Sequence, residues 1–205
     1  MTASASDYRW FLDYRLLVDY GYCAATVPGI TPRRLLDLLE ARGRATAPDL
    51  DSLIGASQDA FEIATVDRQL VGVRAIGTAT LLLQANGWVG VTDELMRPVI
   101  DDHEVAAHFL NVNGVDRFHW WSGRRERLAF EPLAFSARHD LDDDVASETL
   151  AALTDAGFDL DDGDPDSPTA SAWALAENLT GVRVTEDQLA GPWLTGVVTF
   201  PGQQR

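Results

Sequence analysis

Alternation of apolar and charged residues across residues 117–131 constrains the fold of this 205-residue chain more than any other feature. In a β-strand, side chains two positions apart point to the same face of the sheet. Phe118 and Trp120 therefore share one face, as do Leu128 and Phe130 in the run that follows. The two runs predict adjacent strands whose four aromatic and aliphatic side chains belong to the core.

The remaining pattern predicts helices before and after a central series of strands. The most distinct local signal is Thr31-Pro32, a capping residue followed by a proline at the first helical position. Asn86-Gly87 is typical of a two-residue hairpin turn. We expect helices at residues 7–20 (capped by Asp7), 31–43, 92–100, 142–157, 169–179 and 186–190, and strands at residues 20–27, 61–66, 70–76, 78–84, 88–91, 104–112, 117–122, 125–133 and 193–200.

This order indicates a single α+β domain over residues 1–205, with an acidic helical part from about residue 140. We expect a twisted, mainly antiparallel sheet. Helices from the N- and C-terminal parts of the chain pack on it, mainly on one face.

Charge and composition exclude several classes of function. The net charge of -16 argues against nonspecific binding to nucleic acid or to an anionic membrane. All basic residues are arginine, so a Schiff-base lysine and a P-loop lysine are impossible. The single cysteine, Cys23, rules out an intrachain disulfide and a thiolate zinc site. No secretory signal or apolar run of about 20 residues is present, so we expect a soluble cytoplasmic protein.

The second face of the predicted hairpin combines basic and aromatic side chains in an acidic protein. Guanidinium groups stack on indole rings and hold carboxylates or phosphates in two-point contacts. We therefore predict a partner-binding surface formed by Arg117, His119, Trp121, Arg125 and Arg127. The competing interpretation is that Trp121 lies under a terminal helix while the arginines pair with carboxylates of the chain itself.

This region also carries a resemblance to a known family. The chain resembles a domain-of-unknown-function family common in actinobacteria, and the resemblance covers most of the chain up to Phe158. It implies no known activity, cofactor or catalytic residue. The similar segments are Asn111-Val112-Asn113, Phe118, Trp120, Gly123, Phe130-Glu131-Pro132, Asn86-Gly87-Trp88, Asp155-Ala156-Gly157-Phe158, and Asp7-Tyr8 with Gly21-Tyr22-Cys23.

Candidate catalytic and metal motifs are incomplete. His103 and His108 are five apart rather than the four that a zinc-protease helix needs. His119 or His139 could work with a nearby carboxylate as a general acid–base, but no spacing fixes that geometry. The alternating Asp162, Asp164 and Asp166 lack the glycine and glutamate of a calcium loop. We therefore predict no catalytic residue, no metal site and no cofactor.

A second predicted surface is acidic and could engage a basic partner through electrostatic steering, or only be solvated. Its residues are Asp142, Asp143, Asp144, Asp161, Asp162, Asp164 and Asp166. The sequence thus favours a non-catalytic domain that binds another protein, such as an immunity-like inhibitor or a regulatory adaptor. The alternative is a small-ligand-binding domain or small hydrolase using His119 with a carboxylate, in a pocket lined by Trp120 or Trp121. Two oppositely charged patches could also serve self-association.

Overall fold

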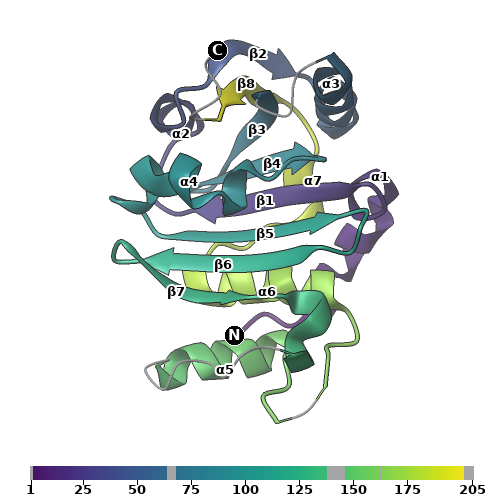
Figure 1. The fold of residues 1–205 in the computed structure, drawn as a ribbon, viewed down its shortest axis with the longest axis vertical. Coiled ribbons are helices and arrows are strands. Elements are labelled where there is room, and N and C mark those ends of the chain that lie inside the picture. Colours follow the sequence, from purple (N-terminus) through teal and green to yellow (C-terminus); the bar gives the residue numbers. More distant parts are fainter. Residues whose placement is uncertain (1, 64–67, 138–145, 162, 201–205) are drawn as a thin grey trace.

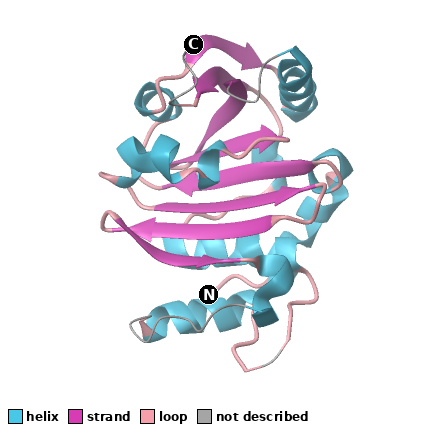
Figure 2. Cartoon of the chain, viewed as in Figure 1, coloured by secondary structure: helices cyan, strands magenta, loops and turns pink. Residues whose placement is uncertain are grey.

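A computed structural model shows an α+β fold built on one eight-stranded antiparallel sheet (Figures 1 and 2). The structure describes residues 2–63, 68–137, 146–161 and 163–200. The strands are β1 Gly21–Val27, β2 Arg42–Ala47, β3 Arg68–Ile76, β4 Ala79–Ala85, β5 Val105–Asn111, β6 Asp116–Ser122, β7 Arg125–Phe130 and β8 Trp193–Thr199. The helices are η1 Ala5–Asp13, α1 Arg15–Val18, α2 Pro32–Leu38, α3 Leu50–Ile63, η2 Val89–Val91, α4 Asp93–Ile100, η3 Pro132–Ala137, α5 Ser147–Ala156, α6 Pro168–Thr180 and α7 Glu186–Leu189.

The strand order is β2-β8-β3-β4-β1-β5-β6-β7, so strands from both ends of the chain belong to the same sheet. The last strand, β8, lies between β2 and β3 and pairs antiparallel with each of them. The β6–β7 hairpin forms one end of the sheet, and β7 is its edge strand (Figure 1). The predicted antiparallel sheet and α+β class are confirmed.

Helices cover both faces of the sheet, not mainly one as the sequence suggested. One core cluster contains residues of η1, α3 and α6. The second contains residues of α2 and α4, which lie on the opposite face (Figure 1). The reason is that β1, β4 and β5 are buried along almost their whole length, and strands that are apolar on both faces need a covering layer on each.

Capping residues mark the starts of two helices. Thr31 Oγ1 accepts a 3.3 Å hydrogen bond from Arg34 N, and Pro32 follows at the first helical position, as predicted. However, α2 ends at Leu38, and Gly43 lies inside β2. The N-terminal helix begins as a 3₁₀ helix capped by Ser4, with Asp7 as the reciprocal partner rather than the cap.

Two segments differ from their predicted secondary structure. Residues 61–63 are the end of helix α3, not a strand; the rest of the predicted 61–66 strand lies outside the described residues. Residues 89–91 form a 3₁₀ turn instead of a strand. There the backbone N–H groups of Trp88 and Val89 donate to the buried side chains of Gln69 and Gln84, at 3.0 and 2.8 Å. These side-chain acceptors replace a strand partner, which explains why the Asn-Gly signal misled.

Candidate binding groove beside the β6–β7 hairpin

The core face of the β6–β7 hairpin is as the sequence predicted, but its second face is not: Arg125 pairs with Ser122, and Arg125 and Arg127 line the Trp120 side rather than the Trp121 side. Phe118 pairs with Phe130 and Trp120 with Leu128, and these four side chains belong to the core or pack against it. A two-residue turn closes the hairpin, with Gly123 at φ 61° and Arg124 at φ 68°. Two consecutive positive φ values are typical of the tight turn that matches strand twist. The register shifts between Trp120 and Trp121, so β7 carries one extra residue.

Trp121 does not lie on the surface predicted for partner binding. Its side chain is 1% exposed and belongs to the core cluster that includes Met96 and Val99 of α4. The ring also stacks on His119, with centroids 5.0 Å apart. The indole packs in the cluster that contains residues of α2, η2 and α4, so internal helices, rather than a terminal one, cover this side of the sheet. Trp121 therefore packs in the core and offers no contact to a partner.

Two other predicted contact residues are paired within the chain. Arg117 forms an ion pair with Glu131 and donates from Nη1 to the Asp116 carbonyl at 2.9 Å. His119 Nδ1 lies 2.6 Å from Glu126 Oε1. Ion pairs this close to solvent contribute about 0 to 1 kcal/mol to stability. They do, however, give Arg117 and His119 partners within the chain, so neither side chain is an unoccupied anion site.

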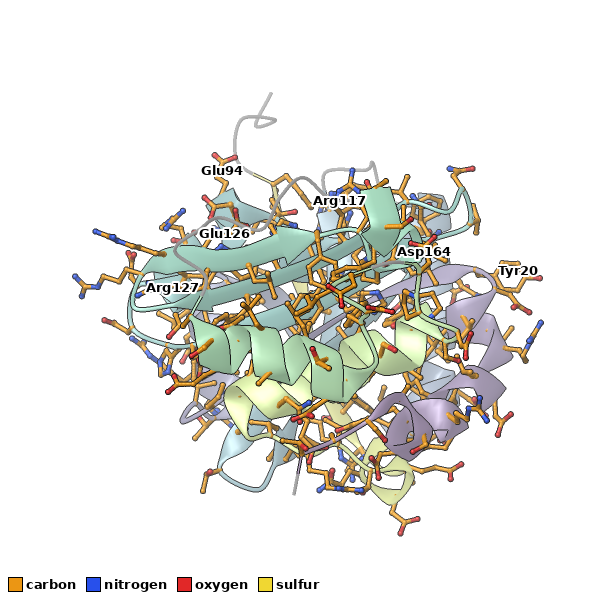
Figure 3. All side chains as sticks on the ribbon, turned by 90° about the horizontal axis from the view of Figure 1, so that it is seen from below. Tyr20, Glu94, Arg117, Glu126, Arg127 and Asp164 are labelled. Atoms are coloured by element: carbon orange, nitrogen blue, oxygen red, sulfur yellow. The ribbon has the colours of Figure 1, made fainter. Side chains whose placement is uncertain are left out.

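Arg125 and Arg127 line a groove of about 580 Å³ between the hairpin and helices α5 and α6. A pocket of this size is typical of ligand-binding sites. Trp120 is anchored there by a 3.0 Å hydrogen bond from Nε1 to Glu104. Figure 3, which looks at this edge of the sheet, labels Arg127 beside β7. The lining residues are Trp120, Ser122, Arg125, Glu126, Arg127, Ala146, Glu148, Thr149, Ala152, Asn178 and Leu179.

The two groove arginines differ from their neighbour Arg124 in their partners. Arg127 donates from Nε to the Ser122 carbonyl at 3.0 Å, and neither Arg125 nor Arg127 pairs with a carboxylate of a described residue. Arg124 instead donates to the Asp101 carbonyl at 2.7 Å and lies 3.7 Å from the Asp102 carboxylate. Among the described part of this hairpin, the groove thus holds the arginines that lack a carboxylate partner.

A buried series of hydrogen bonds lies behind the hairpin, and the sequence did not predict it. Tyr22 Oη lies 2.6 Å from His108 Nδ1, and His108 Nε2 lies 2.6 Å from Asp116 Oδ1. The other carboxylate oxygen of Asp116 accepts a 2.9 Å hydrogen bond from Leu133 N. With Asp116 ionised and the imidazole neutral, His108 donates from Nε2 and accepts the Tyr22 hydroxyl proton at Nδ1. The three side chains join β1, β5 and β6 to η3.

This chain of groups is enclosed by the core. Tyr22, His108 and Asp116 are 0%, 3% and 1% exposed. Burial raises the pKa of Tyr22 well above its ordinary value of 10.0, and the Asp116 carboxylate raises it further. A general acid–base must reach its substrate, so this arrangement serves the packing of the sheet instead. Strand parity could have indicated it, because His108 shares a face with the core residues Ala106 and Leu110.

The remaining candidate residues form no metal cluster in the described part of the chain. No group of three or more His, Cys, Asp or Glu side chains there could hold a metal ion. Asp164 instead accepts a 2.7 Å hydrogen bond from Ser136 N, and this bond lowers the pKa of its carboxyl. Asp161, Asp164 and Asp166 are exposed. Asp142, Asp143, Asp144, Asp162 and His139 lie outside the described residues.

Among the described residues, no helix is long and apolar enough to cross a membrane. A family model described as a family of unknown function (DUF6461) matches residues 1–201, so the chain belongs to that family. The match extends past Phe158, where the resemblance noted from the sequence ended. No curated protein and no solved structure matches the chain.

Proposed function

We propose that this member of a family of unknown function is a non-catalytic binding protein that engages another protein through the groove beside β7. One observation carries the proposal. Arg125 and Arg127 line a 580 Å³ groove without a carboxylate partner among the described residues, whereas Arg117, His119 and Arg124 have one nearby. Charged groups left without partners beside a concave surface are suited to contact an anionic group of a partner.

The composition of the groove supports recognition of a protein segment. Trp120, Ala152 and Leu179 supply apolar surface, while the two arginines supply charge. Tryptophan and arginine are enriched among the residues that dominate the energy of protein interfaces. An immunity-like inhibitor or a regulatory adaptor would both use such a site. The exposed Asp161, Asp164 and Asp166 are a second candidate surface, for a basic partner.

A second candidate function is hydrolysis or binding of a small ligand by His119. The 2.6 Å contact between His119 Nδ1 and Glu126 favours it, because a carboxylate that orients imidazole is common at catalytic sites. The groove lining includes Glu126 but not His119. A ligand in the groove would therefore face the carboxylate rather than the ring, and we place this function second.

The test is capture of partners from a lysate of the producing organism on three immobilised proteins. These are the wild type, the groove variant Arg125→Gln/Arg127→Gln, and the control Arg124→Gln, which removes a charge from the same turn but outside the groove lining. We expect one protein to be retained by the wild type and by the control and lost by the groove variant. Equal retention by all three, or no capture by the wild type, would reject the proposal.

A further inference from the structure

The first turn of helix α5 opens into the same groove. The ten-residue helix Ser147–Ala156 has Ala146 as its N-cap, and no side chain caps it. The backbone N–H groups of Ser147 and Glu148 have no acceptor among the described residues. A helix N-terminus carries a partial positive charge and donors that lack intrahelical partners. Because Ala146 and Glu148 line the groove, these donors lie at its wall.

Thr149, in the same turn, adds a side-chain donor to this wall of the groove. Its side chain is only 6% exposed, yet its hydroxyl makes no hydrogen bond with a described residue. Thr149 also lines the groove. The hydroxyl is not among the enclosed side-chain atoms that lack a partner, so it is the part of this buried side chain that faces the groove. A ligand oxygen in the groove could accept a hydrogen bond from it.

The donors around this part of the groove exceed what one carboxylate can use. Arg125 offers five guanidinium N–H donors and Arg127 four, since its Nε donates to Ser122, and the start of α5 and Thr149 add backbone and hydroxyl donors. A carboxylate offers two oxygens, whereas a phosphate monoester offers three and carries close to two negative charges. Arginine clusters and helix N-termini are the two elements that proteins commonly use to hold phosphate.

The acidic residues of the groove argue for a single compact anion. Glu126 and Glu148 also line it, and Glu126 is held by His119. They and the net charge of -16 repel every anion, a phosphate included, and an extended run of carboxylates would meet this repulsion along its whole length. One doubly charged group placed between the arginines and the start of α5 would lie close to many donors at once. Its attraction to them would therefore be screened little by salt.

We infer that the groove binds a phosphorylated side chain of a partner protein, with Arg125, Arg127, Thr149 and the first turn of α5 as the phosphate site. This inference rests on the proposed function and specifies the chemistry of the partner. Trp120 and Leu179 then contact the residues that flank the phosphorylated one.

The experiment is a titration of the ¹⁵N-labelled full chain, followed by NMR, with a five-residue alanine peptide that carries a central phosphoserine. Matched peptides carry serine or glutamate at the same position, and free phosphoserine is titrated separately. We expect amide shifts in residues 125–127 and 147–149, with a Kd for the phosphopeptide at least tenfold below that for the glutamate peptide. Arg125→Gln/Arg127→Gln should abolish these shifts and Thr149→Val should raise Kd several-fold, while Arg124→Gln leaves it unchanged.

Three results would overturn the inference. They are equal affinity for the glutamate peptide, shifts confined to other regions of the chain, or free phosphoserine binding as tightly as the phosphopeptide. The last would indicate a small phosphate ester rather than a partner protein. Phosphatase treatment of the lysate separates this inference from the proposed function. If capture still depends on the groove arginines after treatment, the binding function stands and the phosphate inference fails.

Discussion

The Nε of Arg127 donates a 3.0 Å hydrogen bond to the carbonyl of Ser122, across the turn that joins β6 to β7. This bond holds the guanidinium beside the groove without neutralising its charge, since the acceptor is an uncharged carbonyl. The register shift in this hairpin accompanies this arrangement. A bulge in an edge strand redirects a side chain that regular pairing would place on one of the two faces.

The turn itself should therefore matter for binding. Gly123 has φ 61°, and a Cβ added there would lie 3.3 Å from Arg127 Nη2. Gly123→Ala is expected to cost about 1 kcal/mol of stability, because alanine disfavours positive φ. It should also weaken partner capture by displacing Arg127. Urea denaturation and the capture assay test this; unchanged capture would mean that the position of Arg127 is not important.

Substitutions of the two adjacent tryptophans should differ in their effects on stability and on partner capture. Trp121 is buried in the core cluster that includes residues of α2 and α4, whereas Trp120 lines the groove. Trp121→Phe should lower the free energy of unfolding and leave capture intact. Trp120→Phe should weaken capture, since it removes apolar surface and the hydrogen bond to Glu104. The reverse pattern would place the binding surface on the other face of the hairpin.

The buried chain of Tyr22, His108 and Asp116 should be a measurable source of stability. Tyr22→Phe removes one hydroxyl and leaves His108 Nδ1 without its donor. The expected loss is about 1 to 2 kcal/mol, the cost of an unsatisfied buried polar group. Tyr20→Phe is the matched control, because Tyr20 is 56% exposed. Equal stability of the two variants, measured by urea denaturation, would show that the hydrogen bond contributes nothing.

Stability should also fall at alkaline pH. Burial raises the pKa of Cys23 from 9.0 to about 12, and raises the pKa values of Tyr8 and Tyr22 above 10.0. When the pKa of a group is higher in the folded state than in the unfolded state, the protonated group stabilises the folded state. The contribution is thus complete below pH 9 and is lost as pH rises through the folded value. In that range, each group lowers the free energy of unfolding by about 1.4 kcal/mol per pH unit. Urea denaturation from pH 7 to 11 should show this decline, with a smaller slope for Tyr22→Phe.

Local patterns in the sequence predicted the hairpin pairing, the α2 start at Thr31-Pro32 and the Gly157 end of α5 correctly. Each depends on side-chain alternation or on one capping residue. The insertion of β8 between β2 and β3 could not be predicted in this way, because strand order depends on contacts between distant segments.

The candidate site also combines residues that local patterns indicate with contacts that depend on distant segments. Composition pointed to Arg125 and Arg127, but alternation placed them on the face of Trp121, whereas the register shift in β7 brings them to the groove with Trp120. The burial of Trp121 depends on α4, and the groove depends on α5 and α6, none of which adjoins the hairpin in sequence. The contacts of Tyr22 with His108 likewise join residues 86 positions apart. Only the assembled sheet brings these groups together.

Hydrogen exchange measured by mass spectrometry, on the protein with and without its captured partner, tests the central claim most directly. A partner in the groove should slow exchange in peptides covering residues 122–128 and 146–152, which form its two walls. Residues 93–100, on the opposite face, should be unaffected. Protection of residues 163–167 instead, which include the exposed Asp164 and Asp166, with no change at the groove walls, would contradict the proposed site.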